Sequence, residues 1–228
     1  LNDIIIYKYN PNGNLDWTKS IGSASDDFGL DICTDNLGYL YITGFYKHTL
    51  YFNQDSLIFN GGVDAFVAKL DTSGLIIWAK GFGNSGNESG NAIHCDNNGG
   101  IYISGTFGDS LSIDGQTLTS YGSLNNYIIK LNTNGSLIWH NSISSPILNN
   151  IQDLKSDTSG NLYLTGHFRD ILTGSLGQLY SYGHNDVFLA KFSTNGNLIW
   201  WKRIGSTAPD QATAIAIDEN NLYVSGIF

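Results

Sequence analysis

The chain has 228 residues, of which 41% are hydrophobic and 14% charged, and its formal net charge is −9. This length and apolar content suffice for one large domain with a buried core. The acidic balance argues against nucleic acid and anionic membranes as partners, because both reward lysine and arginine. No stretch approaches the ~20 apolar residues of a membrane span. The sequence has no methionine and no leader-type segment, so we expect a processed or excised piece of a longer protein.

Short predicted strands and turns alternate along the chain, and the sequence of one strand recurs four times. "GYLYITGFY" begins at Gly38, "GGIYISGTF" at Gly99 and "GNLYLTGHF" at Gly160, and "NNLYVSGIF" ends at Phe228. One copy reads "DAFVAKL", "LIIWAKGF", "NAIHCD" and "IYISGTF", with Gly, Asn and Asp turns between these strands. "SLSIDGQTLTSYG" adds a predicted hairpin with "DG" at its tip. No sustained 3.6-residue period occurs, so almost no helix is expected.

The strands belong to a repeat of 61 residues. Approximate copies cover residues 3–63, 64–124, 125–185 and 186–228 of a single domain, residues 1–228. A four-stranded unit of this size cannot bury both faces alone, so the copies must stack. We predict an all-β fold in which they stack as β-propeller blades, with a linear solenoid as the alternative. The recurring residues are Trp17, Trp78, Trp139 and Trp200; Lys8, Lys69, Lys130 and Lys191; Gly13, Gly74, Gly135 and Gly196; Asp35, Asp96, Asp157 and Asp218; and Tyr41, Tyr102, Tyr163 and, after one deletion, Tyr223.

The recurring side chains have predicted structural roles. Each Trp and each Tyr is expected to fill the seam between neighbouring sheets. Each recurring Asp stands where a hairpin turn needs an Asx-type hydrogen bond. Cys33 and Cys95 sit one position apart in the repeat register, and neighbouring strand positions point to opposite faces. We therefore expect two buried free thiols rather than a disulfide.

The pattern resembles a known repeat family. "D-x-F-x-A-K-x-D-x-x-G-x-x-x-W-A-K" followed by "D-x-x-G-N-x-Y-x-T-G-x-F" is similar to the SBBP-type β-propeller repeat of secreted and cell-surface bacterial proteins. Asp186–Lys191, Gly196–Trp200 and Asp157–Phe168 carry the likeness best, and it spans nearly the whole chain. The third copy departs from it with "SSPILNNIQD", and the added hairpins are longer than usual. The resemblance implies export and a binding, adhesive or scaffolding role, often within a larger protein or assembly.

The resemblance also implies the order of strands within each blade. The strand that ends at the recurring Asp is innermost, the "LYITG" strand follows it, and the Trp-bearing strand is outermost. The chain then begins with two outer strands, in residues 3–21, and ends with two inner ones, in residues 212–228. These halves would form one composite blade in a closed four-bladed ring. An open arc of a larger propeller is the alternative.

Candidate metal ligands lie in the loops that enter the inner strands. Carboxylates there could converge near a channel mouth and bind calcium, which takes six to eight oxygen ligands. Asp153 lies near these loops, and the candidate ligands are Asp26, Asp27, Glu88 and Asp210. No EF-hand or RTX-type spacing is present, and the five histidines form no zinc-type pair. No cofactor is therefore expected apart from calcium.

The sequence predicts no catalytic residue. It has no G-x-S-x-G elbow, and the Gly-rich loop at residues 83–90 lacks the Lys-Ser/Thr ending and the helix of a phosphate site. Aromatic residues in or beside the hairpins and strand ends are the better candidates, because exposed Tyr and Trp suit a protein contact or sugar stacking. These are Tyr46, Tyr51, Tyr121, Tyr180, Tyr182 and Trp201.

The sequence thus predicts a non-enzymatic, exported β-propeller that serves as a protein-recognition, adhesion or structural scaffold, extracellular or on a bacterial cell surface. A lectin-like propeller, assisted by calcium and bound to surface glycans, is the alternative. A hydrolase that uses central carboxylates is a third hypothesis, which no readable acid–base pair supports.

Overall fold

The computed structural model describes the chain except residues 1, 53–54, 120–123 and 220. The described residues form strands, turns and bends without a helix, and all named strands pair in antiparallel fashion. The predicted all-β class is therefore confirmed. The strands are grouped into three four-stranded units, which we call blades 1 to 3, and two terminal two-stranded sheets, which we call half-blades.

The three blades share one order of strands, in which each strand pairs with the next along the chain. Blade 1 contains β3 (Phe28–Thr34), β4 (Leu40–Tyr46), β7 (Asp64–Leu70) and β8 (Ile76–Phe82). Blade 2 contains β9 (Ser89–Cys95), β10 (Ile101–Phe107), β13 (Leu124–Leu131) and β14 (Leu137–Ser145). Blade 3 contains β15 (Leu148–Ser156), β16 (Leu162–Gly174), β17 (Gly177–Phe192) and β18 (Leu198–Ile204).

A hairpin is inserted between the second and third strands of every blade, as predicted. Blade 1 carries β5 (Leu50–Phe52) and β6 (Asp55–Leu57), and blade 2 carries β11 (Ser110–Ile113) and β12 (Gln116–Thr119). In blade 3 the hairpin is a continuous extension of β16 and β17, which pair as far as Gly174 and Gly177. One bridge, between Ser144 and Thr173, joins the sheets of blades 2 and 3.

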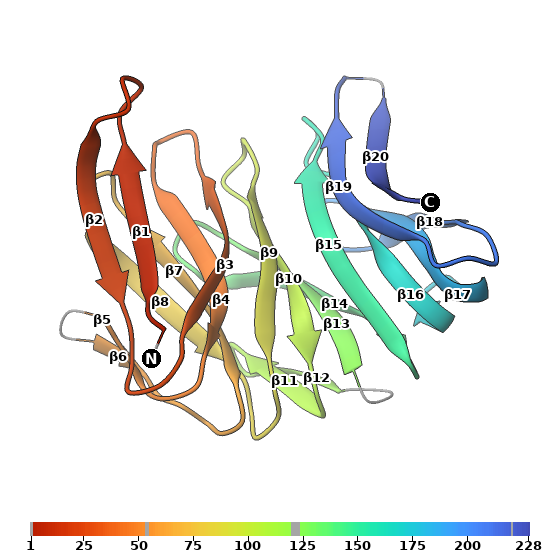
Figure 1. The fold of residues 1–228 in the computed structure, drawn as a ribbon, viewed down its shortest axis with the longest axis horizontal. Helices are drawn as coiled ribbons and strands as arrows, with labels where there is room; N and C mark the ends of the chain where they lie inside the picture. The colour runs from red at the N-terminus through yellow and green to blue at the C-terminus, as the bar shows by residue number, and fades with distance from the viewer. Residues whose placement is uncertain (1, 53–54, 120–123, 220) are drawn as a thin grey trace.

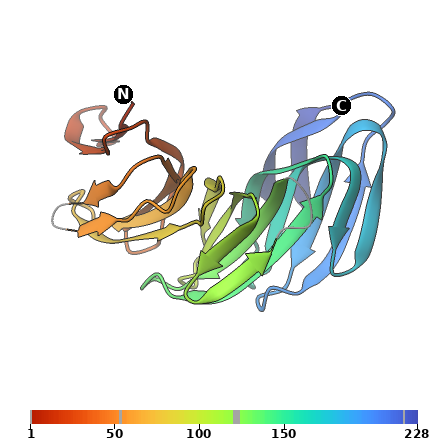
Figure 2. The ribbon, with the colours of Figure 1, turned by 90° about the horizontal axis from the view of Figure 1, so that it is seen from below.

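The two half-blades lie at opposite ends of an open arc (Figures 1 and 2). The N-terminal half-blade contains β1 (Ile4–Tyr9) and β2 (Leu15–Ile21), and the C-terminal half-blade contains β19 (Gln211–Ile217) and β20 (Leu222–Ile227). They form two separate sheets rather than one composite blade. Of the two predicted arrangements, the structure therefore shows the open arc and not the closed ring. In Figure 1, β3, β9, β15 and β19 lie side by side as the inner strands.

The hydrophobic core is divided into layers between successive sheets. One layer joins blades 1 and 2, with Tyr41, Phe82, Ile103 and Tyr127 fully buried in it. A second layer joins blades 2 and 3, and a third joins the N-terminal half-blade to blade 1. The repeated "LYITG" strand supplies these layers, because its alternate side chains enter the spaces on both sides of its sheet.

Three of the four recurring tryptophans form seams between sheets, as predicted. The indole Nε1 of Trp17, Trp78 and Trp139 donates to the carbonyl oxygen of Thr72, Thr133 and Thr194 in the next sheet, at 3.0, 3.1 and 2.9 Å. Each ring lies against a turn glycine: a Cβ at Gly74 or Gly135 would be 3.2 Å from the indole. These glycines also have φ near +80°, a region that costs other residues strain. Glycine is thus required at these turns for two reasons.

The recurring aspartates stabilise the turns, also as predicted. Asp96 Oδ1 accepts from the backbone N–H groups of Asn98 and Gly100 at 2.8 and 2.6 Å. Asp35, Asp157 and Asp218 accept equivalent bonds in their own turns.

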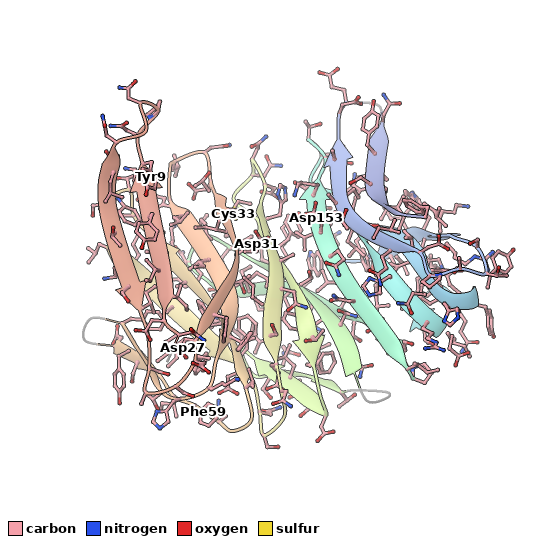
Figure 3. All side chains as sticks on the ribbon, in the orientation of Figure 1. Tyr9, Asp27, Asp31, Cys33, Phe59 and Asp153 are labelled. Atoms are coloured by element: carbon pink, nitrogen blue, oxygen red, sulfur yellow. A yellow bond between two sulfur atoms is a disulfide. The ribbon has the colours of Figure 1, made fainter. Side chains whose placement is uncertain are left out.

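Cys33 and Cys95 form a disulfide with Cα atoms 6.0 Å apart, so the prediction of two free thiols was wrong. That prediction assumed that neighbouring inner strands align at equivalent repeat positions. In the structure, neighbouring inner strands are shifted by one residue relative to the repeat. A residue on one inner strand therefore faces the residue 62 positions later in the chain, rather than 61. Asp31 Oδ2 accepts from Ile93 N at 2.8 Å and Asp153 Oδ2 from Ile215 N at 3.0 Å, with the same separation of 62 residues. Figure 3 shows Asp31 and Cys33 on β3 and Asp153 on β15. This shift of one residue brings the two sulfur atoms together.

Candidate functional site

The predicted contact aromatics are distributed over the hairpins of different blades. Tyr51 is exposed on the β5–β6 hairpin, and Tyr180 and Tyr182 are exposed on the extension of β17. Tyr121 lies outside the described residues. Tyr46 is only 1% exposed, and its hydroxyl donates to Ile58 O at 3.1 Å. Its assignment to a contact surface is corrected: the inserted hairpin covers Tyr46, which stabilises the hairpin from below.

Blade 3 brings the largest number of these aromatics together. The Arg203 guanidinium carbon lies 3.2 Å from the Tyr182 ring centroid, and Nη1 donates to Tyr180 O at 2.7 Å. Arg203 Nε is also 3.5 Å from Asp186 Oδ2, a buried carboxylate. Trp201 is half-buried beneath the tip of the hairpin, where a Cβ at Gly174 would be 3.0 Å from its ring. We call Tyr180, Tyr182, Trp201 and Arg203 the blade 3 aromatic surface.

This surface presents rigid aromatic area. A guanidinium stacked on a ring and bonded to a strand carbonyl fixes both partners, so little rotamer entropy is lost on binding. Tyr182 is 61% exposed and Tyr180 57%, in spite of these contacts. Sequence reasoning found the two tyrosines and Trp201 but missed Arg203, because its backbone pairs with Phe188 and only the fold of the β17 extension brings it to the tyrosines.

The predicted metal ligands do not converge. Asp26, Asp27, Glu88 and Asp210 precede the inner strands of different sheets, and in the described part of the chain no three His, Cys, Asp or Glu side chains gather as a metal site. Asp26 accepts from Asn2 N at 2.8 Å, on the surface. The expectation of convergence was wrong because equivalent loops of successive sheets are kept apart along the arc. Calcium binding itself stays a prediction.

In the structure, the Glu88 and Asp210 side chains instead lie close to the side chain of the residue 24 positions before each of them in the chain. A Cβ at Gly83 would collide with Asp64 Oδ1 and lie 2.8 Å from Glu88 Oε2. A Cβ at Gly205 would lie 2.9 Å from both Asp186 and Asp210. In the third copy the equivalent residues are the buried amides Asn125 and Asn149, and Ser144 replaces the glycine. The spacing of 24 residues, repeated every 61, could have revealed these pairs.

The carboxylates of these pairs are deeply buried, with few hydrogen bonds. Glu88 Oε2 accepts from Asn84 N at 3.0 Å and Asp64 Oδ2 from Asn60 N at 2.7 Å, whereas Glu88 Oε1 and Asp64 Oδ1 have no partner among the described residues. Burial raises the pKa of the Glu88 carboxyl, and the nearby Asp64 charge adds to this effect. Burial also raises the pKa of Asp64, Asp27 and Asp186.

We expect Glu88→Gln to stabilise the protein increasingly as the pH rises. Because the folded-state pKa of Glu88 is raised, the native state is favoured when this carboxyl is protonated, and that contribution is lost as the pH rises through the folded pKa. The difference in unfolding free energy, variant minus wild type, should therefore grow as the pH rises above about 4 and become constant above the folded-state pKa, with a total of about 1.4 kcal/mol per unit of pKa shift. Urea titrations at successive pH values measure it.

Asp71→Asn is the matched control, because hydrogen bonds from Ser73 and Leu75 lower the Asp71 pKa. Its difference should have the opposite sign: the loss of stability should be complete above the unfolded-state pKa of about 4, and it should shrink as the pH falls through the lower folded-state pKa. A Glu88→Gln difference that is flat with pH would contradict the raised pKa.

No family model matches the chain. An uncharacterized WD repeat-containing protein of Acanthamoeba polyphaga mimivirus is 26% identical over 287 aligned positions, which cover 98% of this chain and 21% of that protein. The chain therefore spans about a fifth of the relative's length. A protein of unknown function from Bacteroides caccae covers 90% of both chains at 8% identity with a TM-score of 0.22, too low to support an argument.

The relative and the repeated antiparallel sheets agree on a repeat protein built from β-strands. The described residues include no helix of the length and apolar character needed to cross a membrane.

Proposed function

We propose that this chain is a non-enzymatic, propeller-type scaffold that binds a protein partner through the blade 3 aromatic surface. The observation that carries the proposal is the pair of exposed tyrosines, Tyr180 and Tyr182, with Arg203 stacked on the Tyr182 ring and bonded to the backbone carbonyl of Tyr180. Interfaces concentrate their binding energy in Tyr, Trp and Arg side chains of this kind. The similarity to a protein named for WD repeats supports a role in protein interaction.

The remaining parts of the proposal concern family and location. The 61-residue period and its motifs support an SBBP-type propeller. The Cys33–Cys95 disulfide supports export, because structural disulfides persist mainly in oxidising compartments. A cell-surface scaffold in which the arc positions partners is consistent with these features. Bound calcium and an adhesive role are further parts of the same proposal.

The proposal is tested with a partner captured by a photoreactive amino acid placed at position 178, beside Tyr180. We expect Tyr180→Ala/Tyr182→Ala to weaken binding of the purified partner at least tenfold, about 1.4 kcal/mol, by surface plasmon resonance. Tyr51→Ala is the matched control, since Tyr51 is equally exposed on the blade 1 hairpin and should leave the affinity unchanged.

The same variants separate the alternatives. A glycan array read with and without calcium should give no signal; a glycan signal that Tyr182→Ala abolishes would favour the lectin and overturn the protein-binding proposal. Equal loss of binding in Tyr51→Ala and the double variant would show that the blade 3 aromatic surface has no special role.

A further inference from the structure

The acids Asp64 and Glu88 lie close together where blade 1 meets blade 2. Asp64 begins β7, and Glu88 directly precedes Ser89, the first residue of β9 (Figure 1). Their exposed fractions are 0% and 1%. A Cβ at Gly83 would collide with Asp64 Oδ1 and lie 2.8 Å from Glu88 Oε2. Because both oxygens lie beside this one point, a single ion can reach both carboxylates.

The described protein does not balance these two carboxylates. Asp64 Oδ2 accepts from Asn60 N at 2.7 Å, and Glu88 Oε2 accepts from Asn84 N at 3.0 Å. Asp64 Oδ1 and Glu88 Oε1 have no hydrogen-bond partner in the described part of the chain. The ion pairs of the same residues include no lysine, arginine or histidine bound to either acid. Buried carboxylates are normally paired with a cation or coordinate a metal ion.

Two other copies of the repeat show how such a pair is balanced. In the fourth copy the acids are Asp186 and Asp210, and Arg203 Nε lies 3.5 Å from Asp186 Oδ2. In the third copy the same positions carry the buried amides Asn125 and Asn149, which have no charge to balance. A cationic side chain therefore accompanies the acids in one copy, and neutral groups replace the acids in the other.

The second copy has the acids but lacks the arginine. The residue at the position of Arg203, two repeats earlier, is Gly81. An added Cβ at Gly81 would collide with the Tyr46 hydroxyl, so a longer side chain has no room at this position. A cation that balances the acid pair of the second copy must therefore come from the solvent.

Hydrogen bonds distinguish the second copy from the first. In the first copy, Ser23 donates from its backbone N–H to Asp27 Oδ2 at 2.5 Å and from its hydroxyl to Asp27 Oδ1 at 3.0 Å. The equivalent residue of the second copy is Asn84, whose side-chain amide donates to Ser110 Oγ at 2.7 Å instead. Glu88 therefore receives the backbone bond from this position without the side-chain bond.

A polar cavity beside the acid pair gives an ion access from the solvent. It has a volume of about 730 Å³ and is lined by Asn60, Gly83, Asn84 and Ser110, among others. Asn60 and Asn84 also donate their backbone N–H groups to the two carboxylates, so the cavity and the acid pair share a wall. Calcium takes six to eight oxygen ligands in flexible geometry, whereas magnesium demands a strict octahedron and dehydrates reluctantly.

We propose that Asp64 and Glu88 bind one calcium ion, which enters from the polar cavity and has the role that Arg203 has beside Asp186. The ion neutralises the two carboxylates and links β7 of blade 1 to the segment before β9 of blade 2. Water and neutral oxygens of the cavity complete its coordination. The inference rests on the calcium that the proposed function includes, and it is independent of the blade 3 aromatic surface.

Calorimetric titration of the whole, EDTA-treated chain with calcium chloride near neutral pH tests the site. Asp64→Asn/Glu88→Gln should bind one ion fewer than the wild type, or bind it at least tenfold more weakly. This double variant should fold, because it carries the kind of amide pair that the chain itself has in its third copy. Asp71→Asn is the matched control: it removes the acid that follows the other end of β7 and should bind calcium like the wild type.

Thermal unfolding adds a readout that a purely structural role of Glu88 would not give. In EDTA, Glu88→Gln should raise the Tm, since the uncompensated acid pair is then relieved of one charge. With calcium at about 100 times its Kd, the wild-type Tm should rise by about 5 °C or more, and the Tm of Glu88→Gln by less than half as much. The calcium-induced rise should exceed the rise that the same concentration of magnesium gives.

The possible failures are distinguishable. Calcium binding that the double variant keeps, or that Asp71→Asn loses equally, would overturn this site and leave the calcium of the proposed function in place. A wild type that binds no calcium would overturn both, and Glu88→Gln would then stabilise equally with and without calcium, as expected of two acids that share a proton. Partner binding by the blade 3 aromatic surface, measured by surface plasmon resonance, should be unchanged in the double variant.

Discussion

Removal of the Cys33–Cys95 disulfide is expected to lower the free energy of unfolding by about 4 kcal/mol. The bond joins the inner strands of blades 1 and 2 across a sequence separation of 62 residues. Closing a loop of this length restricts the unfolded chain, and that restriction is lost when the bond is cut. Urea denaturation of Cys33→Ser/Cys95→Ser, compared with the wild type in oxidising buffer, measures the difference.

Reduction by dithiothreitol should give the same loss in the wild type and none in the double variant, which controls for effects of the reductant. The expectation fails if native protein contains two titratable thiols, or if the double variant unfolds at the wild-type urea concentration. If removal of the disulfide loosens only the contact between blades 1 and 2, a protease should cut the double variant at that contact sooner than it cuts the wild type. The contact between blades 2 and 3 should stay resistant to the protease.

The sheets and their seams were predictable because the repeat makes every local signal appear several times. A single "LYITG" strand or a single Trp is weak evidence, but its return after 61 residues with the same turn glycine fixes both register and role. The Asp turns follow from local chemistry alone. Whether the arc closes could not be predicted, since closure depends on how each sheet is rotated relative to the next, which sequence period does not encode.

The predictions that failed concern contacts between sheets. The disulfide was rejected because residues 61 positions apart were expected to face each other on neighbouring inner strands. In the structure the facing residues, Asp31 and Ile93 or Cys33 and Cys95, are 62 positions apart. Calcium ligands were sought across loops, whereas burial pairs Asp64 with Glu88 within one copy. Tyr46 was placed on the surface because the packing of the added hairpin over it leaves no sequence signal. Each error concerns a contact between segments that are distant in the sequence, and the period of the repeat does not predict such contacts.

Trp78→Ala is expected to destabilise the protein by about 3 kcal/mol, at the lower end of the range for large aromatic truncations because the ring is half-buried. The substitution removes the hydrogen bond to Thr133 O, the contact with Gly135 and the edge contact with Tyr41, whose ring centroid is 6.1 Å away. It also leaves a cavity in the layer between blades 1 and 2. Urea denaturation monitored by circular dichroism measures the loss.

Trp200→Ala is the matched control, because Trp200 keeps the equivalent contact with Tyr163 at 6.1 Å but contacts no turn glycine among the described residues. It should cost about 1 kcal/mol. Equal losses for the two variants would show that the stability comes from the ring's own blade rather than from the seam.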